Sequence, residues 1–273
     1  MSTGAIGMRK VLRRLASLLG DLTPATFPWP GMYVSLASGR QFHLVGSIHM
    51  GTSAMAPLPA RLLERLEQAQ ALIVEADITA SPPLTSVGEA QIPLANRLSA
   101  AHYDRVCQLS EDYQLDLAAL DGLPPWHVAL LLQSRQAERL GLRADFGIDY
   151  QLIQAACAND QPVIELEGPE EQLALLRRLP DEGVALLADT LTHWHTNARL
   201  LQVMIRWWLE SRPVDVRQAF PSTFSHDLYS YLMTDRNHRW KSTLQQLPPG
   251  TYVVAVGALH LYGADNLPGL LRQ

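Results

Sequence analysis

A six-residue pattern, Val-Gly-(Ser/Ala)-(Ile/Leu)-His-(Met/Leu), occurs twice in this chain, at residues 45–50 and 256–261. Each copy follows an apolar run that is typical of a buried strand. The glycine lets the backbone turn sharply or approach a ligand closely. His49 and His260 then lie just beyond their strands, at the edge where open α/β sheets bind ligands. A single such histidine is more often a cap or a core residue, but two with matching flanks predict a shared metal site.

Two glutamates follow the other apolar runs of the chain. Glu75 ends the run at 71–75, and Glu167 lies near the end of the run at 162–168. If all four strands are parallel neighbours, these carboxylates converge with the two imidazoles. Such a set suits Zn²⁺, Mn²⁺, Fe²⁺ or Co²⁺, and a water on that metal reaches a pKa near 7 and becomes a nucleophile. One glutamate could instead be the general base, and the sequence does not divide these roles.

Three further polar residues are candidates for the same site. Arg236 and Asn237 lie on the helix that precedes the last strand. An arginine near a metal site could clamp an oxyanion or a substrate carboxylate, although spacing alone favours an exposed helix arginine. Asp149, within residues 147–149, could equally cap the helix that follows it or belong to the site.

Strand and helix patterns alternate through residues 31–273, which predicts one α/β domain. We expect a central mixed, partly parallel sheet with helices around it and a helical cap over its edge. Residues 80–94 are rich in proline, serine and glycine and predict a loop, interpreted as a mobile lid. The helical segment 184–210 has an unusually apolar face that favours core packing. The alternatives are a groove for an apolar or peptide partner, or a membrane contact.

Composition and charge exclude several classes of protein. A net charge of −5 and 47% hydrophobic residues suit a globular protein and do not favour nucleic-acid binding. Residues 1–30 are interpreted as a basic amphipathic helix and a linker. Arg13 and Arg14 interrupt its apolar part, which argues against a signal peptide and leaves packing on the domain or peripheral contact with an anionic membrane. No stretch is long enough to predict a transmembrane span, so a cytoplasmic protein is expected.

Taken together and in their order along the chain, these motifs resemble the TraB/PrgY/GumN family, which includes the TIKI metalloproteases. The motifs lie at residues 46–49, 74–75, 147–149, 165–167, 236–237 and 257–260. The resemblance covers the chain from about Phe42 to the end, and it is closest to the enterobacterial GumN-like members. It implies a fold related to erythromycin esterases and haem-binding ChaN-like proteins, and, by analogy with TIKI proteins, peptide cleavage that depends on Mn²⁺ or Co²⁺. Its motif histidines match His49 and His260, its acidic motifs match Glu75 and Glu167, and its Arg-Asn motif falls on residues 236–237, with Asp235 where glutamate is usual.

The leading hypothesis is a metal-dependent hydrolase that attacks a peptide, or a small ester or amide, with metal-bound water. In this hypothesis His49 and His260 bind the metal with Glu75, Glu167 or both, while Arg236 or Asn237 steadies the oxyanion. The alternative is a binding protein for haem or a peptide without turnover, since histidines are good axial haem ligands. A third interpretation is a purely structural site with the Trp-rich helix as a partner surface.

Overall fold

The computed structural model describes residues 27–77, 79, 92–210 and 223–273. The predicted N-terminal amphipathic helix lies outside the described residues, and so do residues 80–91 of the predicted lid loop.

Five strands form a single sheet in the order β1-β2-β5-β3-β4. The strands are β1 (Gly31–Ser35), β2 (Arg40–Ser47), β3 (Ala71–Val74), β4 (Val163–Glu165) and β5 (Gly250–Gly257). β1 pairs antiparallel with β2, whereas the β2·β5, β5·β3 and β3·β4 pairs are parallel. The first parallel strand of the chain therefore lies beside the last. The predicted mixed, partly parallel sheet is confirmed.

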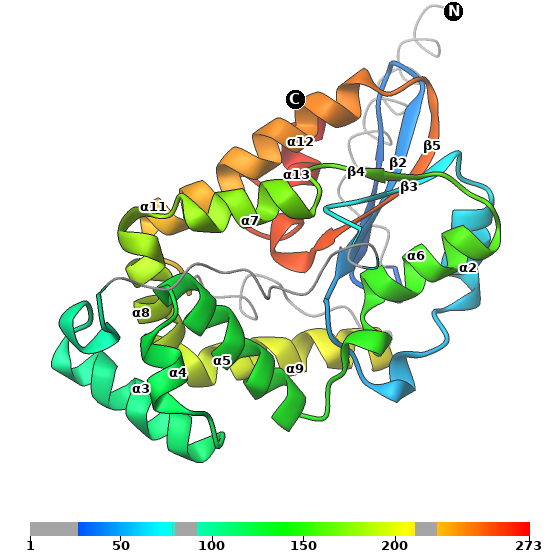
Figure 1. Cartoon of the computed structure of the whole chain (residues 1–273). Coiled ribbons are helices and arrows are strands. Elements are labelled where there is room, and N and C mark those ends of the chain that lie inside the picture. The colour runs from blue at the N-terminus through cyan, green and yellow to red at the C-terminus, as the bar shows by residue number, and fades with distance from the viewer. Residues whose placement is uncertain (1–26, 78, 80–91, 211–222) are drawn as a thin grey trace, which may run out of the picture.

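Alternate residues of β5 face two different helical layers, as the two-residue period of a strand requires. Val253 and Ala255 pack with α2 (Ala60–Glu67) and α6 (Ile148–Ala158) on one face of the sheet. Val254 and Val256 pack with α12 (Asp235–Gln246) and α13 (Leu267–Leu271) on the other. Because both faces are covered, β3 and β5 are almost entirely apolar. Figure 1 shows the sheet between these two layers.

A helical cap with its own apolar core lies at one end of the molecule, away from the sheet (Figure 1). It consists of α3 (Ala100–Asp112), α4 (Leu117–Asp121), α5 (Pro125–Arg139), α8 (Val184–Thr192) and α11 (His226–Tyr229), with α7 (Pro169–Arg177) packed against it. Short helical turns lie between the helices and strands of the whole fold: η1 (Ser53–Met55), η2 (Leu94–Asn96), η3 (Ala144–Phe146), η4 (Pro180–Gly183), the π-helical turn η5 (Ser230–Thr234) and η6 (Ala258–His260). Pro125 occupies the first turn of α5, where its missing N–H is not needed.

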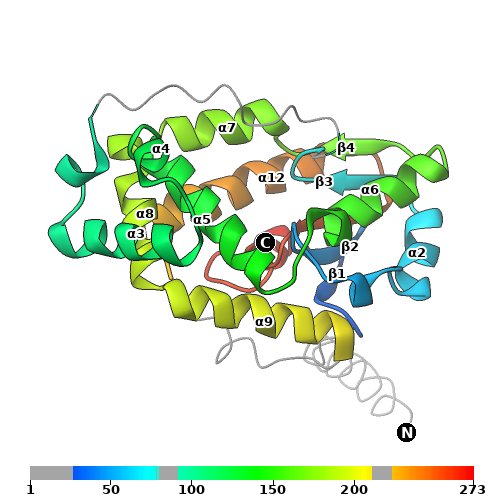
Figure 2. The ribbon, with the colours of Figure 1, turned by 60° about the horizontal axis from the view of Figure 1, so that its bottom comes forward.

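The Trp-rich helix α9 (Trp194–Glu210) joins the cap to the sheet. Trp194 packs into the cap core, and Trp208 packs into the core beneath the sheet, where its Nε1 donates to the carbonyl of Gly46 at 3.2 Å. Trp207 packs against Ala258, beside the last strand. Figure 2 shows α9 running past both parts of the fold. The prediction of core packing is confirmed for Trp194, Met204, Trp207 and Trp208, whereas Leu200 and Leu201 are only partly buried and Leu209 is exposed. Within the described residues, no helix is long and apolar enough to cross a membrane.

Candidate functional site

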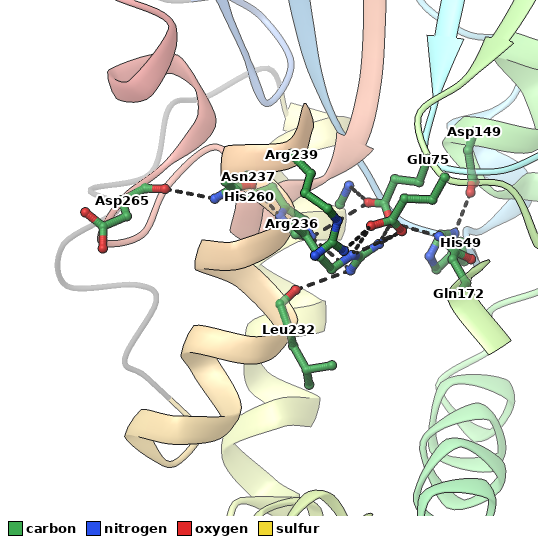
Figure 3. Close-up of polar contacts among 12 residues, drawn as sticks. His49, Glu75, Asp149, Gln172, Leu232, Arg236, Asn237, Arg239, His260 and Asp265 are labelled. Carbon is green, nitrogen blue, oxygen red and sulfur yellow. Dashed lines mark hydrogen bonds and ion pairs between the residues drawn. The ribbon is translucent and has the colours of Figure 1, made fainter. Parts of the chain in front are cut away.

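The four predicted ligand residues all follow the carboxyl ends of parallel strands. His49 follows β2, His260 follows β5, Glu75 follows β3 and Glu167 follows β4. Because the strand order here is β2-β5-β3-β4, the two histidines come from neighbouring strands, and so do the two glutamates. One edge of the sheet therefore positions all four residues. Figure 3 shows the polar contacts that their side chains make.

The glycines of the repeated pattern are required by close packing, not by a sharp turn. Neither Gly46 nor Gly257 has a positive φ. A Cβ on Gly46 would lie 3.1 Å from the Cβ of Pro30 and 3.2 Å from that of Ala258. A Cβ on Gly257 would lie 3.3 Å from Oε1 of Glu75, and the Gly257 N–H donates to this same oxygen at 2.6 Å. The second copy of the pattern therefore holds the carboxylate as well as supplying the histidine.

Arg236 lies at the centre of the polar cluster. Its Nη2 donates to Oε2 of Glu75 at 2.6 Å and to Oε2 of Glu167 at 2.9 Å, and its Nε donates to Oε1 of Glu167 at 2.9 Å. Its Cζ lies 4.6 Å from the ring centroid of Trp240. Burial lowers the pKa of this guanidinium, but Glu75 and Glu167 outweigh that effect and raise it. The side chain is only 10% exposed, so the interpretation of an exposed helix arginine is wrong.

Glu75 is an ionised carboxylate whose two oxygens both accept hydrogen bonds. Burial by itself raises its pKa, but Arg236, the nearby histidines and the Gly257 N–H together hold the pKa at about 2. Nε2 of Gln172, on α7, adds a longer hydrogen bond of 3.2 Å to Oε2. Glu75 therefore brings a permanent negative charge to the end of β3, and the side chains around it fix its orientation.

Asn237 determines which nitrogen of His260 carries the proton. Its Nδ2 donates to the carbonyl oxygen of Asp265 at 2.9 Å, so its Oδ1 is the acceptor for His260 Nδ1–H at 2.7 Å. The lone pair of Nε2 then faces Nη1 of Arg236 at 3.3 Å and lies 4.0 Å from Oε1 of Glu75. Burial, with Arg236 assisting, outweighs the attraction of Glu75 and lowers the pKa of His260 to about 4. His260 is therefore a neutral imidazole with a defined tautomer.

His49 has the opposite protonation. Its Nδ1 donates to Oδ2 of Asp149, whose negative charge raises the pKa of His49 to about 9. Asp149 is buried in the first turn of α6 and is not the cap of that helix, because Gly147 occupies the N-cap position. Between the two roles left open for Asp149, the structure favours the site. The ring of His49 remains 62% exposed, with Nε2 as its outer nitrogen.

The second oxygen of Asp149, Oδ1, is buried and has no hydrogen-bond partner. Asp149 also borders a small cavity of about 10 Å³ whose polar walls include Ser47, His49, Glu75 and Gln172. That is about the space that one water molecule needs, and several polar groups surround it. The cavity lies between the protonated histidine and the ionised glutamate.

The residues fit a divalent metal in their chemistry but not in their present spacing. His49 and His260 each have Nδ1 held by a side-chain oxygen, which is how proteins orient imidazoles that bind metal through Nε2. Glu167 fits less well, because its oxygens accept from both Arg236 and Arg239. Among the residues that the structure describes, no three His, Cys, Asp or Glu side chains are grouped closely enough to hold an ion. The guanidinium of Arg236 provides the positive charge between the two glutamates.

A large cavity opens onto these polar residues. It has a volume of about 510 Å³, and His49, Glu75, Arg236 and His260 line one part of it, while α5 and α9 line another. This volume is typical of sites for small ligands. Asn237 is not among the lining residues, which agrees with its hydrogen bonds to His260 and Asp265.

Two contributors to the site carry no signal in the sequence. Gln172 and Arg239 look like ordinary polar residues of surface helices, and only the packing of α7 and α12 at the edge of the sheet brings them to the glutamates. For Asp149, the sequence left two roles equally open, a helix cap and a site residue. The position of Asp149 two residues after Gly147, whose absent Cβ would lie 2.4 Å from the carbonyl oxygen of His49, places it beside that histidine.

Comparisons with known proteins find relatives that match this chain along almost its whole length. The chain is 49% identical over 263 residues to the protein described as "Uncharacterized protein YbaP" of Escherichia coli K12, a match that covers 96% of this chain and 99% of that protein. The protein of the same description from Shigella flexneri matches with the same identity and coverage. No solved structure matches, so the predicted kinship with erythromycin esterases and ChaN-like proteins stays a prediction. The model of the TraB/PrgY/gumN family matches residues 34–273, and the chain belongs to this family.

Proposed function

We propose that this protein is a metal-dependent hydrolase of peptide, ester or amide bonds and that the polar cluster at the edge of the sheet is its reacting centre. The observation that carries this proposal is the pair of oriented imidazoles on one cavity, with Asp149 holding Nδ1 of His49 and Asn237 holding Nδ1 of His260. A hydrogen bond at Nδ1 fixes the orientation of each ring, which matters where Nε2 must meet a reacting atom or a metal.

The two histidines have pKa values displaced in opposite directions, and such pairs identify acid and base roles. With a pKa of about 9, His49 is a proton donor at neutral pH. With a pKa of about 4, His260 is neutral and its Nε2 is a proton acceptor. These values hold for the metal-free site, in which His260 would accept a proton and His49 would donate one. With Nε2 of both rings on the metal, neither ring can transfer a proton, and the metal would itself lower the pKa of the attacking water. Glu75, ionised throughout, would offset the positive charge of the metal.

Arg236 and Asn237 have different roles in this proposal. Nη2 and Nε of Arg236 are engaged by Glu75 and Glu167 at 2.6–2.9 Å, whereas Nη1 makes only longer contacts of 3.3 Å to Leu232 O and His260 Nε2. Nη1 is therefore the atom that would exchange a partner to steady an oxyanion. Both amide atoms of Asn237 are engaged as well. Asn237 is therefore a positioning residue for His260, and the oxyanion role falls to Arg236.

The metal would be held by His49, His260 and Glu75. When bound, it would supply a water whose pKa approaches 7. His49 must lose the proton on Nε2 before this nitrogen can bind a cation, so metal binding releases a proton. Mn²⁺, Co²⁺, Zn²⁺ and Fe²⁺ all accept nitrogen and oxygen ligands of these kinds.

The test compares metal content and hydrolysis in the same preparations. Protein purified without an affinity tag is analysed by elemental mass spectrometry as wild type, His49→Ala, His260→Ala and, as a matched control, His195→Ala, an exposed histidine on α9. We expect close to one metal per chain, lost in the two site variants and retained in the control. Circular dichroism checks that each variant is folded.

Two results would reject parts of the proposal separately. Stoichiometric metal retained in both site variants, or none after reconstitution, rejects the metal site. Hydrolysis of a panel of peptides and p-nitrophenyl esters at equal rates by wild type and His260→Ala rejects the reacting centre. A Soret band formed on titration with haem, with loss of that band in His49→Ala, would favour the haem-binding alternative instead.

A further inference from the structure

Apart from the polar cluster, the lining of the large cavity is mostly apolar. Its apolar side chains come from α5, α9 and the turns η5 and η6: Leu130, Leu200, Leu201, Met204, Met233 and Leu259. The same cavity is bounded at its other part by His49, Glu75, Arg236 and His260. A ligand whose polar group meets the imidazoles would therefore have its remaining atoms against leucine and methionine side chains.

Leu200 and Leu201 are only partly buried, although Trp194, Met204 and Trp207 on the same helix are buried. Since helix positions three and four apart share a face, α9 uses neighbouring parts of its surface for two purposes. The tryptophans hold the helix between the cap and the sheet. The leucines present apolar surface to the cavity.

The polar side chains on this wall are partly used within the protein. Nε2 of Gln133 donates to Oγ1 of Thr190 at 2.9 Å, and Nε2 of Gln136 donates to the carbonyl oxygen of Trp194 at 3.0 Å. Each of these amide groups therefore already uses one of its two N–H donors within the protein. Charged groups of the cavity are confined to the cluster at the edge of the sheet, as far as the described lining residues extend.

We propose that the substrate carries an apolar chain on its acyl side, and that this chain lies between α5 and α9 while the carbonyl meets the polar cluster. The inference rests on the proposed function, because it names the substrate class of the same centre. The chain could be the acyl group of a lipid-like ester or the apolar side chain of an amino acid, and both offer the same chemistry to the wall. Its burial removes apolar surface from water, which favours binding in proportion to length.

The test measures kcat/KM for p-nitrophenyl acetate, butanoate and octanoate, with leucine and alanine p-nitroanilides as the amino-acid arm. Octanoate has four more methylenes than butanoate, and each buried methylene raises kcat/KM about fourfold. Burial of even two of them should give octanoate an advantage of at least about tenfold. Ser134→Phe, which adds a ring to the α5 wall of the cavity, should remove the advantage of octanoate over butanoate. Arg135→Phe is the matched control, because it adds the same ring to the exposed surface of α5, and it should leave that advantage unchanged. If leucine anilide is favoured over alanine anilide while the esters show no trend, the chain is an amino-acid side chain.

A binding measurement separates this inference from the proposed function. Displacement of a fluorescent anilinonaphthalene sulfonate probe by octanoate is measured in folded His260→Ala, which should bind without turnover. Hydrolysis with no preference for chain length in either arm overturns the inference and leaves the hydrolase proposal standing. Octanoate binding that Ser134→Phe abolishes, without hydrolysis of any substrate, supports the apolar site and rejects the hydrolase. If octanoate does not bind and hydrolysis shows no preference for chain length, the apolar site is rejected.

Discussion

Arg236 and Glu75 form a buried ion pair, in which Nη2 of the guanidinium donates to Oε2 of the carboxylate at 2.6 Å. The same guanidinium also holds Glu167. One arginine from α12 therefore bridges two negative charges at the ends of neighbouring strands, and Arg239 from the same helix is a second partner of Glu167. This arrangement connects the stability of the sheet edge to the electrostatics of the candidate site, because the group that neutralises the carboxylates also borders His260.

Replacement of Arg236 by alanine should strongly destabilise the protein, because it leaves the carboxylates of Glu75 and Glu167 buried without their main partner. Removal of one partner from a buried pair costs about 3–5 kcal/mol. Urea unfolding followed by circular dichroism measures the loss. Arg239→Ala is the matched control: this arginine contacts Glu167 at 3.2 Å but is 54% exposed, so its loss should cost less than about 1 kcal/mol. Equal losses for the two variants would contradict a central role for Arg236.

The pairing of Asp149 with His49 can be measured directly. Asp149→Asn keeps the size of the side chain and removes the charge that raises the pKa of His49 to about 9. In the variant, the His49 ring should titrate at a lower pH than in wild type. Proton NMR of the imidazole C2–H, recorded on chelator-treated protein, follows this titration, and His49→Gln assigns the resonance among the nine histidines. Identical titration in wild type and Asp149→Asn would show that the two side chains do not interact.

The edge position of the site could be predicted from the sequence, and the contacts within it could not. Each apolar run fixes where its strand ends, so His49, Glu75, Glu167 and His260 follow from the strand pattern, and parallel pairing brings those ends together. The contacts depend on how each helix is rotated against the sheet, which a single sequence does not give for a polar residue. Arg236 illustrates this, because its spacing on a charged helix suggests solvent and tertiary packing buries it.

Asp149 illustrates the same limit in another way. An aspartate next to a helix start is typical of a cap, and the local pattern offers no reason to choose otherwise. Only the contact between the loop after β2 and the start of α6, where Ile148 N donates to Ile48 O at 3.0 Å, places it beside His49. The fold class could be predicted because hydrophobic periodicity determines it, whereas the ion pairs arise from non-local packing.

The stability supplied by the His49–Asp149 pair should depend on pH with a defined sign. The pKa of His49 is raised from an ordinary value of about 6.5, so its folded state binds the proton more tightly than the unfolded chain does. The contribution is therefore fully present below pH 6.5 and is lost as the pH rises through about 9. For chelator-treated protein, the difference in free energy of unfolding between wild type and Asp149→Asn should shrink between pH 6 and pH 10. A difference that grows over this range would contradict the assignment.

The close packing around the first copy of the repeated pattern predicts an asymmetry between two glycines. In Gly46→Ala the new methyl group would lie 3.1 Å from the Cβ of Pro30 and 3.2 Å from that of Ala258, both on short, stiff side chains. Such overpacking costs about 1–3 kcal/mol. Gly122 has an ordinary helical conformation at the end of α4, with the nearest atom 3.7 Å from a new Cβ, so Gly122→Ala should be neutral or stabilise by about 0.4–1 kcal/mol. Thermal unfolding of both variants measures the difference. A Gly46→Ala protein as stable as Gly122→Ala would show that the strand end after Val45 has room to spare, and that the glycine of the repeated pattern is there for a reason other than packing.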